Sequence, residues 1–264
     1  MKLQVAGEDI YCYNNDKDVQ YHQRSVMFVH GSGMDHTIWT PFVRHFARHG
    51  YNAFAPDLPG HGRSLGHPRR TISEMGDWLL SLLDEIEIEA TTIAGHSLGS
   101  LIALDCAARY PERVSAIAMV GTTAPMPVAD AILDASREND PVSYHLLTEY
   151  GYSRPHLLGS SPHPGMWMVG NTMSLFARSA AGVLNADMSA CNTYEQGLAL
   201  AGEITCPVAV VLGEKDRLTP PRGAANLLQA LPQPAVTVIE GAGHMLTSEA
   251  PNELLDALKS LLKC

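Results

Sequence analysis

Long apolar runs are missing from this chain. Nowhere in its 264 residues do the roughly 18 or more consecutive apolar residues of a membrane-spanning helix occur. The N-terminal residues 1–9 also lack the apolar segment that a secretory signal peptide requires. We therefore expect a soluble, unprocessed protein without a membrane span.

Paired cysteines and positive charge are also scarce. The 18 Lys and Arg residues stand against 28 Asp and Glu residues, and the formal net charge of −10 disfavours a nucleic-acid partner, because binding to phosphates needs clustered positive charge. The cysteines are odd in number, far apart and without a C-x-x-C motif, which indicates neither a disulfide framework nor a zinc cluster. Reduced thiols in the cytoplasm are the simplest account. The five residues are Cys12, Cys106, Cys191, Cys206 and Cys264.

Short apolar runs alternate with helix-forming segments through much of the chain. Such runs predict buried parallel strands, and residues 3–13 predict one or two further strands in a hairpin. A last helix is predicted at residues 252–263. A mostly parallel, doubly wound α/β sheet of about eight strands, with helices on both faces, buries all of these runs. The apolar runs are residues 25–29, 51–56, 90–94, 114–121, 207–213 and 235–240.

The alternation of strand and helix stops between residues 122 and 202. This stretch is rich in Met, Leu and aromatic residues, is punctuated by prolines and has no clear strand pattern. We expect an α/β core formed by residues 1–122 and 203–264, with residues 123–202 inserted as a helical cap. Its apolar side chains could line a substrate pocket, but Met and aromatic residues in helical segments are more often ordinary core, so they define no binding set. These side chains are Met166, Trp167, Met168, Met173, Leu175 and Phe176.

The sequence Gly95-His96-Ser97-Leu98-Gly99 joins a predicted strand to a predicted helix at residues 100–110. In this context G-x-S-x-G predicts a nucleophile elbow, a sharp turn that holds the serine in a strained backbone with its hydroxyl exposed. The two glycines fit because strand and helix crowd together where they meet. Free N–H groups at the helix start then face the negative charge that develops on a bound carbonyl oxygen. Ser97 is therefore the predicted nucleophile, the alternative being an unreactive serine in a Gly-rich turn.

A serine hydroxyl is a poor nucleophile until a base takes its proton, so a histidine oriented by a carboxylate is needed. Asp216 and His244 each follow a predicted strand, and the chain order Ser97, Asp216, His244 is one in which such triads occur. Glu214 is the rival carboxylate. No acid follows the strand at residues 114–121, which favours Asp216.

The elbow and these residues together make the chain resemble the α/β-hydrolase superfamily over essentially its whole length. The resemblance implies that Ser97 is the nucleophile, His244 the general base and acid, and Asp216 the orienting carboxylate. In related enzymes, one oxyanion-hole N–H belongs to the residue after a His-Gly pair and the other to the residue after the nucleophile. Here those residues are Ser32 and Leu98.

Other polar residues near these motifs have structural interpretations. The segment Asp57–Ser64 resembles a loop found across the superfamily, and we interpret it as structural. We also interpret His30 and His96 as structural histidines, because the motifs give neither a part in proton transfer. His45 and His49 have the spacing of a metal site, but neighbouring arginines favour a solvated basic helix face. The side chains of Ser32 and His36 have two open interpretations, substrate binding and loop packing.

The resemblance implies a serine hydrolase, esterase- or lactonase-like, that cleaves a small ester, thioester or lactone with an apolar acyl part and needs no cofactor or metal. Ser97 disfavours the branches with an aspartate nucleophile, such as haloalkane dehalogenases and epoxide hydrolases. C–C bond hydrolysis, perhydrolysis and acyl transfer use the same triad and stay open, although the His-Gly-Gly-Gly run of many C–C hydrolases is missing. A small-molecule receptor or scaffold without catalysis is the alternative from another class.

Overall fold

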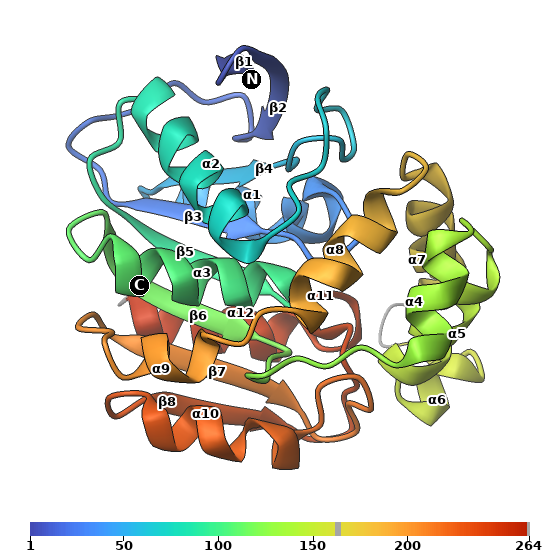
Figure 1. Ribbon diagram of the computed structural model, residues 1–264. Coiled ribbons are helices and arrows are strands. Elements are labelled where there is room, and N and C mark those ends of the chain that lie inside the picture. Colours follow the sequence, from blue (N-terminus) through green and yellow to red (C-terminus); the bar gives the residue numbers. More distant parts are fainter. Residues whose placement is uncertain (162–164, 263–264) are drawn as a thin grey trace.

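The eight strands of the computed structural model form one sheet in the order β1-β2-β4-β3-β5-β6-β7-β8 (Figure 1). The structure describes residues 1–161 and 165–262. The strands β1 and β2 form an antiparallel hairpin that joins β4 antiparallel, and all pairs from β4 to β8 are parallel. The predicted mostly parallel sheet is thus confirmed. The strands are β1 (Lys2–Val5), β2 (Glu8–Tyr13), β3 (Ser25–Val29), β4 (Asn52–Pro56), β5 (Thr91–His96), β6 (Val114–Val120), β7 (Val208–Gly213) and β8 (Ala235–Ile239).

Burial explains the apolar composition of the strands. Every residue of β3, β4, β5 and β7 is buried, as expected for parallel strands that are covered on both faces. The edge strand β8 is exposed except at Ile239. The carboxyl ends of the parallel strands therefore meet at one edge of a rigid sheet.

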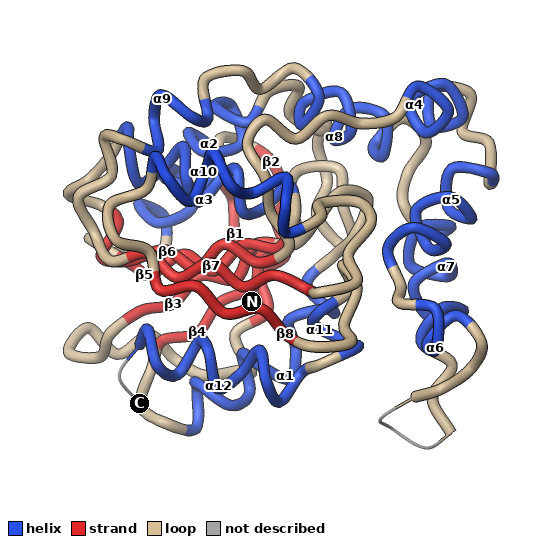
Figure 2. The backbone as a smooth tube through the Cα atoms, turned by 90° about the horizontal axis from the view of Figure 1, so that it is seen from below, coloured by secondary structure: helices blue, strands red, loops and turns tan. Residues whose placement is uncertain are grey.

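Helices cover both faces of this sheet (Figure 2). On one face α2 (Ile72–Glu85), α3 (Leu98–Arg109) and α10 (Ala225–Ala230) build one apolar cluster. On the other face α1 (Thr40–Arg48) and α12 (Pro251–Leu262) build a second.

Two of the helices begin with a tighter turn. Short 3-10 turns, η1 (His36–Trp39) and η2 (Pro221–Ala224), precede α1 and α10. Lys263, where the last helix was predicted to end, and Cys264 lie outside the described residues. Within the described ranges, every helix is too short or too polar to cross a bilayer.

The segment between β6 and β7 is helical and contains no strand among its described residues. Four of its helices, α4 to α7, stand beside the sheet at the carboxyl ends of the strands (Figure 1). They pack on a third apolar cluster, which includes Tyr152 and Phe176 together with Met34 and Met245 of the core. The last helix, α9, packs instead against α3 and α10. The helices are α4 (Asp130–Arg137), α5 (Val142–Gly151), α6 (Arg154–Leu157), α7 (Met168–Arg178), α8 (Val183–Asn192) and α9 (Gly197–Ala201).

Candidate active site

Ser97 occupies a strained turn between β5 and α3. Its φ of 53° and ψ of −116° lie where a residue with a side chain pays about 1–3 kcal/mol of strain. Its N–H donates to the Val120 carbonyl at 2.8 Å, which fixes the turn to the neighbouring strand. A Cβ on Gly95 would overlap the backbone carbonyl of Gly99, so the close approach of strand and helix requires glycine there. Ser97 is the one partly exposed residue in a buried run from residue 91 to residue 107.

His244 and Asp216 form a buried pair on the loops that follow β8 and β7. The Nδ1–H of His244 donates to Asp216 Oδ2 at 2.7 Å, and both residues are 3% exposed. The Thr219 hydroxyl donates to the same oxygen at 2.7 Å. Burial alone would raise the pKa of Asp216, but the charge of His244 and the hydrogen bonds from His244 and Thr219 outweigh burial and lower that pKa. Asp216 is therefore held as a carboxylate that faces the imidazole.

The rival carboxylate Glu214 lies on the surface, away from the imidazole. Its side chain contacts the Lys215 ammonium at 2.9 Å and accepts from the Gly241 N–H at 2.9 Å. Geometry therefore selects Asp216 as the partner of His244.

Ser97 and His244 both line one cavity of about 320 Å³. Both the core and the helical segment between β6 and β7 line it. Of the six apolar side chains singled out in that segment, only Phe176 lies along the wall, whereas Met166 and Trp167 are 46% and 68% exposed. The other apolar side chains of the wall include Met34, Met126, Val128, Ile132, Leu146, Leu147, Met188, Leu218 and Met245.

Two backbone N–H groups, one on a residue of the cavity wall and one on the residue after Ser97, have no acceptor within the described part of the chain. They belong to Ser32, on the loop after β3, and to Leu98, the first residue of α3. The N-terminus of α3 adds a partial positive charge at Leu98. The two groups are thus free to donate to a ligand oxygen.

The two histidines beside these loops make backbone contacts. His30 donates from Nδ1 to the Gly31 carbonyl at 2.9 Å and accepts from the Leu58 N–H with Nε2 at 3.1 Å. His96 donates from Nε2 to the His244 carbonyl at 2.9 Å, which ties β5 to the His244 loop. Burial lowers the pKa of His30 to about 4, and the charge of His61 is the second cause. Burial also lowers the pKa of His96 to about 3, and there the charge of His244 is the second cause. Both rings are neutral near pH 7.

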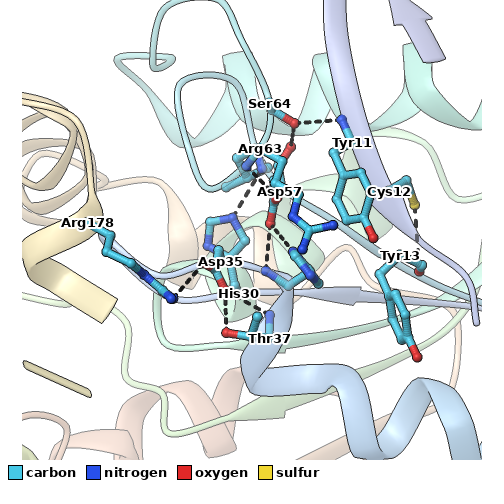
Figure 3. Close-up of polar contacts among 12 residues, drawn as sticks. Tyr11, Cys12, Tyr13, His30, Asp35, Thr37, Asp57, Arg63, Ser64 and Arg178 are labelled. Atoms are coloured by element: carbon cyan, nitrogen blue, oxygen red, sulfur yellow. Dashed lines mark hydrogen bonds and ion pairs between the residues drawn. The ribbon is translucent and has the colours of Figure 1, made fainter. Parts of the chain in front are cut away.

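A cluster of Asp35, His36 and Asp57 has ligand atoms within 4.8 Å of one another, but their hydrogen bonds indicate a structural role. Asp57 Oδ1 accepts from the His36 backbone and ring N–H groups at 2.7 and 2.8 Å, and Oδ2 accepts from the Arg63 N–H at 2.8 Å. Figure 3 shows Asp57 beside Arg63, and Arg178 pointing toward Asp35. The Arg178 guanidinium lies 3.4 Å from Asp35 Oδ2. The His36 side chain thus packs within the loop. Through Asp57, the segment Asp57–Ser64 holds both His36 and its own residue Arg63 in place.

The other predicted histidine pair lies on the surface of α1. The rings of His45 and His49 stack at 4.1 Å, and His49 Nδ1 donates to the His45 carbonyl at 2.7 Å. The stacked rings belong to an exposed helix end rather than to a cluster of ligands.

Sequence reasoning missed Glu249, whose carboxylate holds the loop that carries His244. Glu249 is 4% exposed and accepts from the N–H groups of Gly243 at 3.1 Å and Met245 at 3.2 Å, the residues on either side of His244. It also accepts from the Ser153 N–H at 3.0 Å, beyond the end of α5. Its place five residues after His244, before a predicted helix, carries no distinctive sequence signal.

Comparisons with known proteins agree with this geometry. A model described as the alpha/beta hydrolase family matches residues 26–257. A curated relative, (E)-2-((N-methylformamido)methylene)succinate hydrolase of Acinetobacter baylyi, is 23% identical over 261 residues, which are 95% of this chain and 96% of the relative. A thermophilic esterase from Thermogutta terrifontis matches with a TM-score of 0.85 and 20% identity over 100% of this chain and 97% of its own. The enol-lactonase from Burkholderia xenovorans matches with a TM-score of 0.85 and 18% identity over 100% of both chains. At these identities the solved structures support the fold.

Proposed function

The chain belongs to the alpha/beta hydrolase family, and we propose that it is a serine hydrolase that cleaves small carboxylic esters, thioesters or lactones through an acyl-enzyme on Ser97. The observation that carries this proposal is the single cavity lined by Ser97 and by His244, whose imidazole is bonded to Asp216. The similar proteins support hydrolysis, since their names are those of a hydrolase, an esterase and an enol-lactonase, and the last two names are those of enzymes for ester-type bonds.

Acylation depends on the side chains of Ser97, His244 and Asp216. Because Asp216 accepts the Nδ1–H of His244, the free nitrogen is Nε2, which takes the hydroxyl proton as Ser97 Oγ attacks the carbonyl carbon. His244 then gives this proton to the departing alkoxide or thiolate. A water molecule, activated by the same nitrogen, hydrolyses the acyl-enzyme and restores the serine.

The oxyanion of each tetrahedral intermediate accepts from the N–H groups of Ser32 and Leu98. These donors are fixed by the loop after β3 and by the start of α3, so they cost no reorganisation when the charge forms. A single donor of this kind contributes about 2.7–4 kcal/mol to transition-state stabilisation, which makes the pair comparable to the base in importance.

The substrate is small and has an apolar acyl part, because apolar side chains form most of the cavity wall. Residues 123–202 serve as a cap over the carboxyl ends of the strands and provide the wall residues that choose the acyl group. No cofactor or metal takes part, since the triad and the two N–H groups supply every step.

A fluorophosphonate probe tests the proposal, because it reacts only with an activated serine. Wild type is expected to be labelled and to hydrolyse p-nitrophenyl acetate, and Ser97→Ala to lose both labelling and turnover while staying folded. Ser32→Ala, at the other serine of the cavity wall, keeps its backbone N–H and should still be labelled. Unlabelled wild type would support a receptor or scaffold instead, and labelled Ser97→Ala would refute the nucleophile.

A further inference from the structure

One face of α8 packs directly on the loop that carries the Ser32 N–H. The Gly33 N–H donates to Asp187 Oδ2 at 2.8 Å, and the Ser32 hydroxyl lies 3.9 Å from Cys191 Sγ, one helical turn further on. Gly33 has a φ of 65°, a conformation that favours glycine, and it lies close to the Leu184 side chain of α8. The loop and α8 therefore form one packed unit.

A second core residue binds the same carboxylate oxygen. His61 Nε2 lies 2.9 Å from Asp187 Oδ2, and His61 Nδ1 lies 3.0 Å from the Pro59 carbonyl. Both ring nitrogens thus face acceptors, which requires a doubly protonated imidazolium. The Asp187 side chain is 0% exposed and that of His61 is 1% exposed, so solvent screens neither charge.

The electrostatic environment agrees with this protonation state. Burial alone would lower the pKa of His61, but the charge and the hydrogen bond of Asp187 raise it above its ordinary value. His30, whose ring centre lies 4.8 Å from that of His61, has a lowered pKa and stays neutral, so it does not repel the imidazolium. Asp57 adds further negative charge near both rings.

We propose that Asp187, fixed by His61, is a positioning residue that holds the Gly33 N–H and thereby aims the neighbouring Ser32 N–H at the oxyanion. This inference rests on the proposed function, since it needs Ser32 as an oxyanion donor. An anionic acceptor buried against the loop orients the peptide N–H more firmly than a neutral acceptor does. The helix that forms part of the cavity wall thus also sets the geometry of catalysis.

The test compares Asp187→Ala and Asp187→Asn with wild type on p-nitrophenyl acetate. Fluorophosphonate titration counts the reactive serines, so that kcat is expressed per competent site. Removal of the acceptor lets the Ser32 N–H drift, and kcat per site should fall about 10- to 100-fold in Asp187→Ala while KM changes less than about threefold. Both contacts of Asp187 are made by Oδ2, so an asparagine oxygen in that place can still accept from the Gly33 N–H and from His61 Nε2, and Asp187→Asn should recover most of this loss.

An alkyl trifluoromethyl ketone gives a second readout. Ser97 Oγ adds reversibly to its carbonyl carbon, the C=O π bond becomes the oxyanion, and the hydroxyl proton passes to His244. Its inhibition constant should rise in Asp187→Ala by about the same factor as kcat falls, because both depend on the oxyanion contacts. Asp134→Asn, which breaks the exposed ion pair with Arg137 on α4, is the matched control and should leave both values unchanged.

The outcomes separate this inference from the proposed function. Wild type that neither reacts with the probe nor hydrolyses the ester refutes the proposed function itself. If wild type is active and the kcat per site of Asp187→Ala stays within threefold of it, only the positioning inference is refuted. The same holds if Asp187→Ala loses competent sites but keeps the wild-type inhibition constant. If Asp187→Ala does not fold, Asp187→Asn and His61→Ala decide together. Asp187→Asn should keep the inhibition constant and kcat per site, whereas His61→Ala should raise the inhibition constant and lower kcat per site. Unchanged values in both variants refute the inference.

Discussion

The substitution Asp216→Asn tests the hydrogen bonds around His244 most sharply. Every contact of the Asp216 carboxylate is a donor: Oδ1 accepts the N–H groups of Leu218 and Thr219 at 2.8 Å each, and Oδ2 accepts from the Thr219 hydroxyl and the His244 ring. An asparagine can offer only one oxygen. The two backbone donors fix where that oxygen goes, because they cannot rotate away.

With its oxygen toward the backbone, the asparagine presents NH₂ to His244 Nδ1. The imidazole then carries its proton on Nε2 and cannot accept the proton of Ser97. The reversed amide leaves two buried N–H groups without an acceptor at about 1–3 kcal/mol each, so at most a few per cent of the enzyme keeps the productive tautomer. The loss of negative charge beside the imidazolium adds to this. We expect kcat to fall about 10³- to 10⁴-fold, the upper figure being the effect of the same change in a serine-protease triad.

The assay is steady-state hydrolysis of p-nitrophenyl acetate, with thermal unfolding to show that the variant is folded. Glu214→Gln is the matched control, because it makes the same chemical change at the neighbouring surface carboxylate and should keep wild-type kcat. A folded Asp216→Asn enzyme within tenfold of wild type would refute the argument from tautomers. A collapse of Glu214→Gln alone would transfer the role to Glu214.

Two further predictions concern buried carboxylates. Glu249→Gln should lower kcat on p-nitrophenyl acetate about 3- to 30-fold with little change in KM, because one amide oxygen cannot accept from all the N–H groups that flank His244. The control is Glu253→Gln, which changes an exposed carboxylate. Equal kcat in the two variants would contradict the prediction. Burial opposes the charge on His61, but Asp187 raises the pKa of its folded state above the reference value of 6.5. The stability that results is complete below pH 6.5 and is lost as pH rises through the folded pKa. Urea unfolding between pH 5 and 9 should therefore show the stability difference between wild type and Asp187→Asn shrinking with pH, and a constant difference would be inconsistent with a charged pair.

The fold was predictable because its signals are local. A continuous apolar run such as residues 25–29 or 208–213 has few alternatives to a buried strand in a chain of this length. The place of Ser97 was equally accessible, since the glycines, the preceding strand and the following helix are adjacent in sequence. Asp216 and His244 followed from the rule that loops after parallel strands share one edge of the sheet.

The contacts that support the site were not predictable, because each joins residues far apart in sequence. His61 and Asp187 are separated by 126 positions, and nothing near either residue announces the other. Apolar composition also did not distinguish, within the helical segment, the residues that line the cavity from those exposed on the surface. Trp167 is largely exposed while Phe176 lines the cavity, although both belong to the same Met-rich stretch. Which face of a short helix turns inward depends on its neighbours in space.

The helical segment between β6 and β7 contacts both halves of the proposed machinery. Asp187 holds the loop of Ser32, and at the other side the His244 N–H donates to the Gly151 carbonyl at 2.6 Å, at the end of α5. In the loop after α5, the Ser153 N–H donates to Glu249, the carboxylate that holds the His244 loop. A wall that only chose among substrates would need no hydrogen bonds to the loop of the oxyanion donor and to the backbone of the base. Because these bonds are buried and short, a shift of α5 or α8 changes the distance between Ser32 and His244 as well as the shape of the cavity. Selectivity and rate therefore depend on the same contacts.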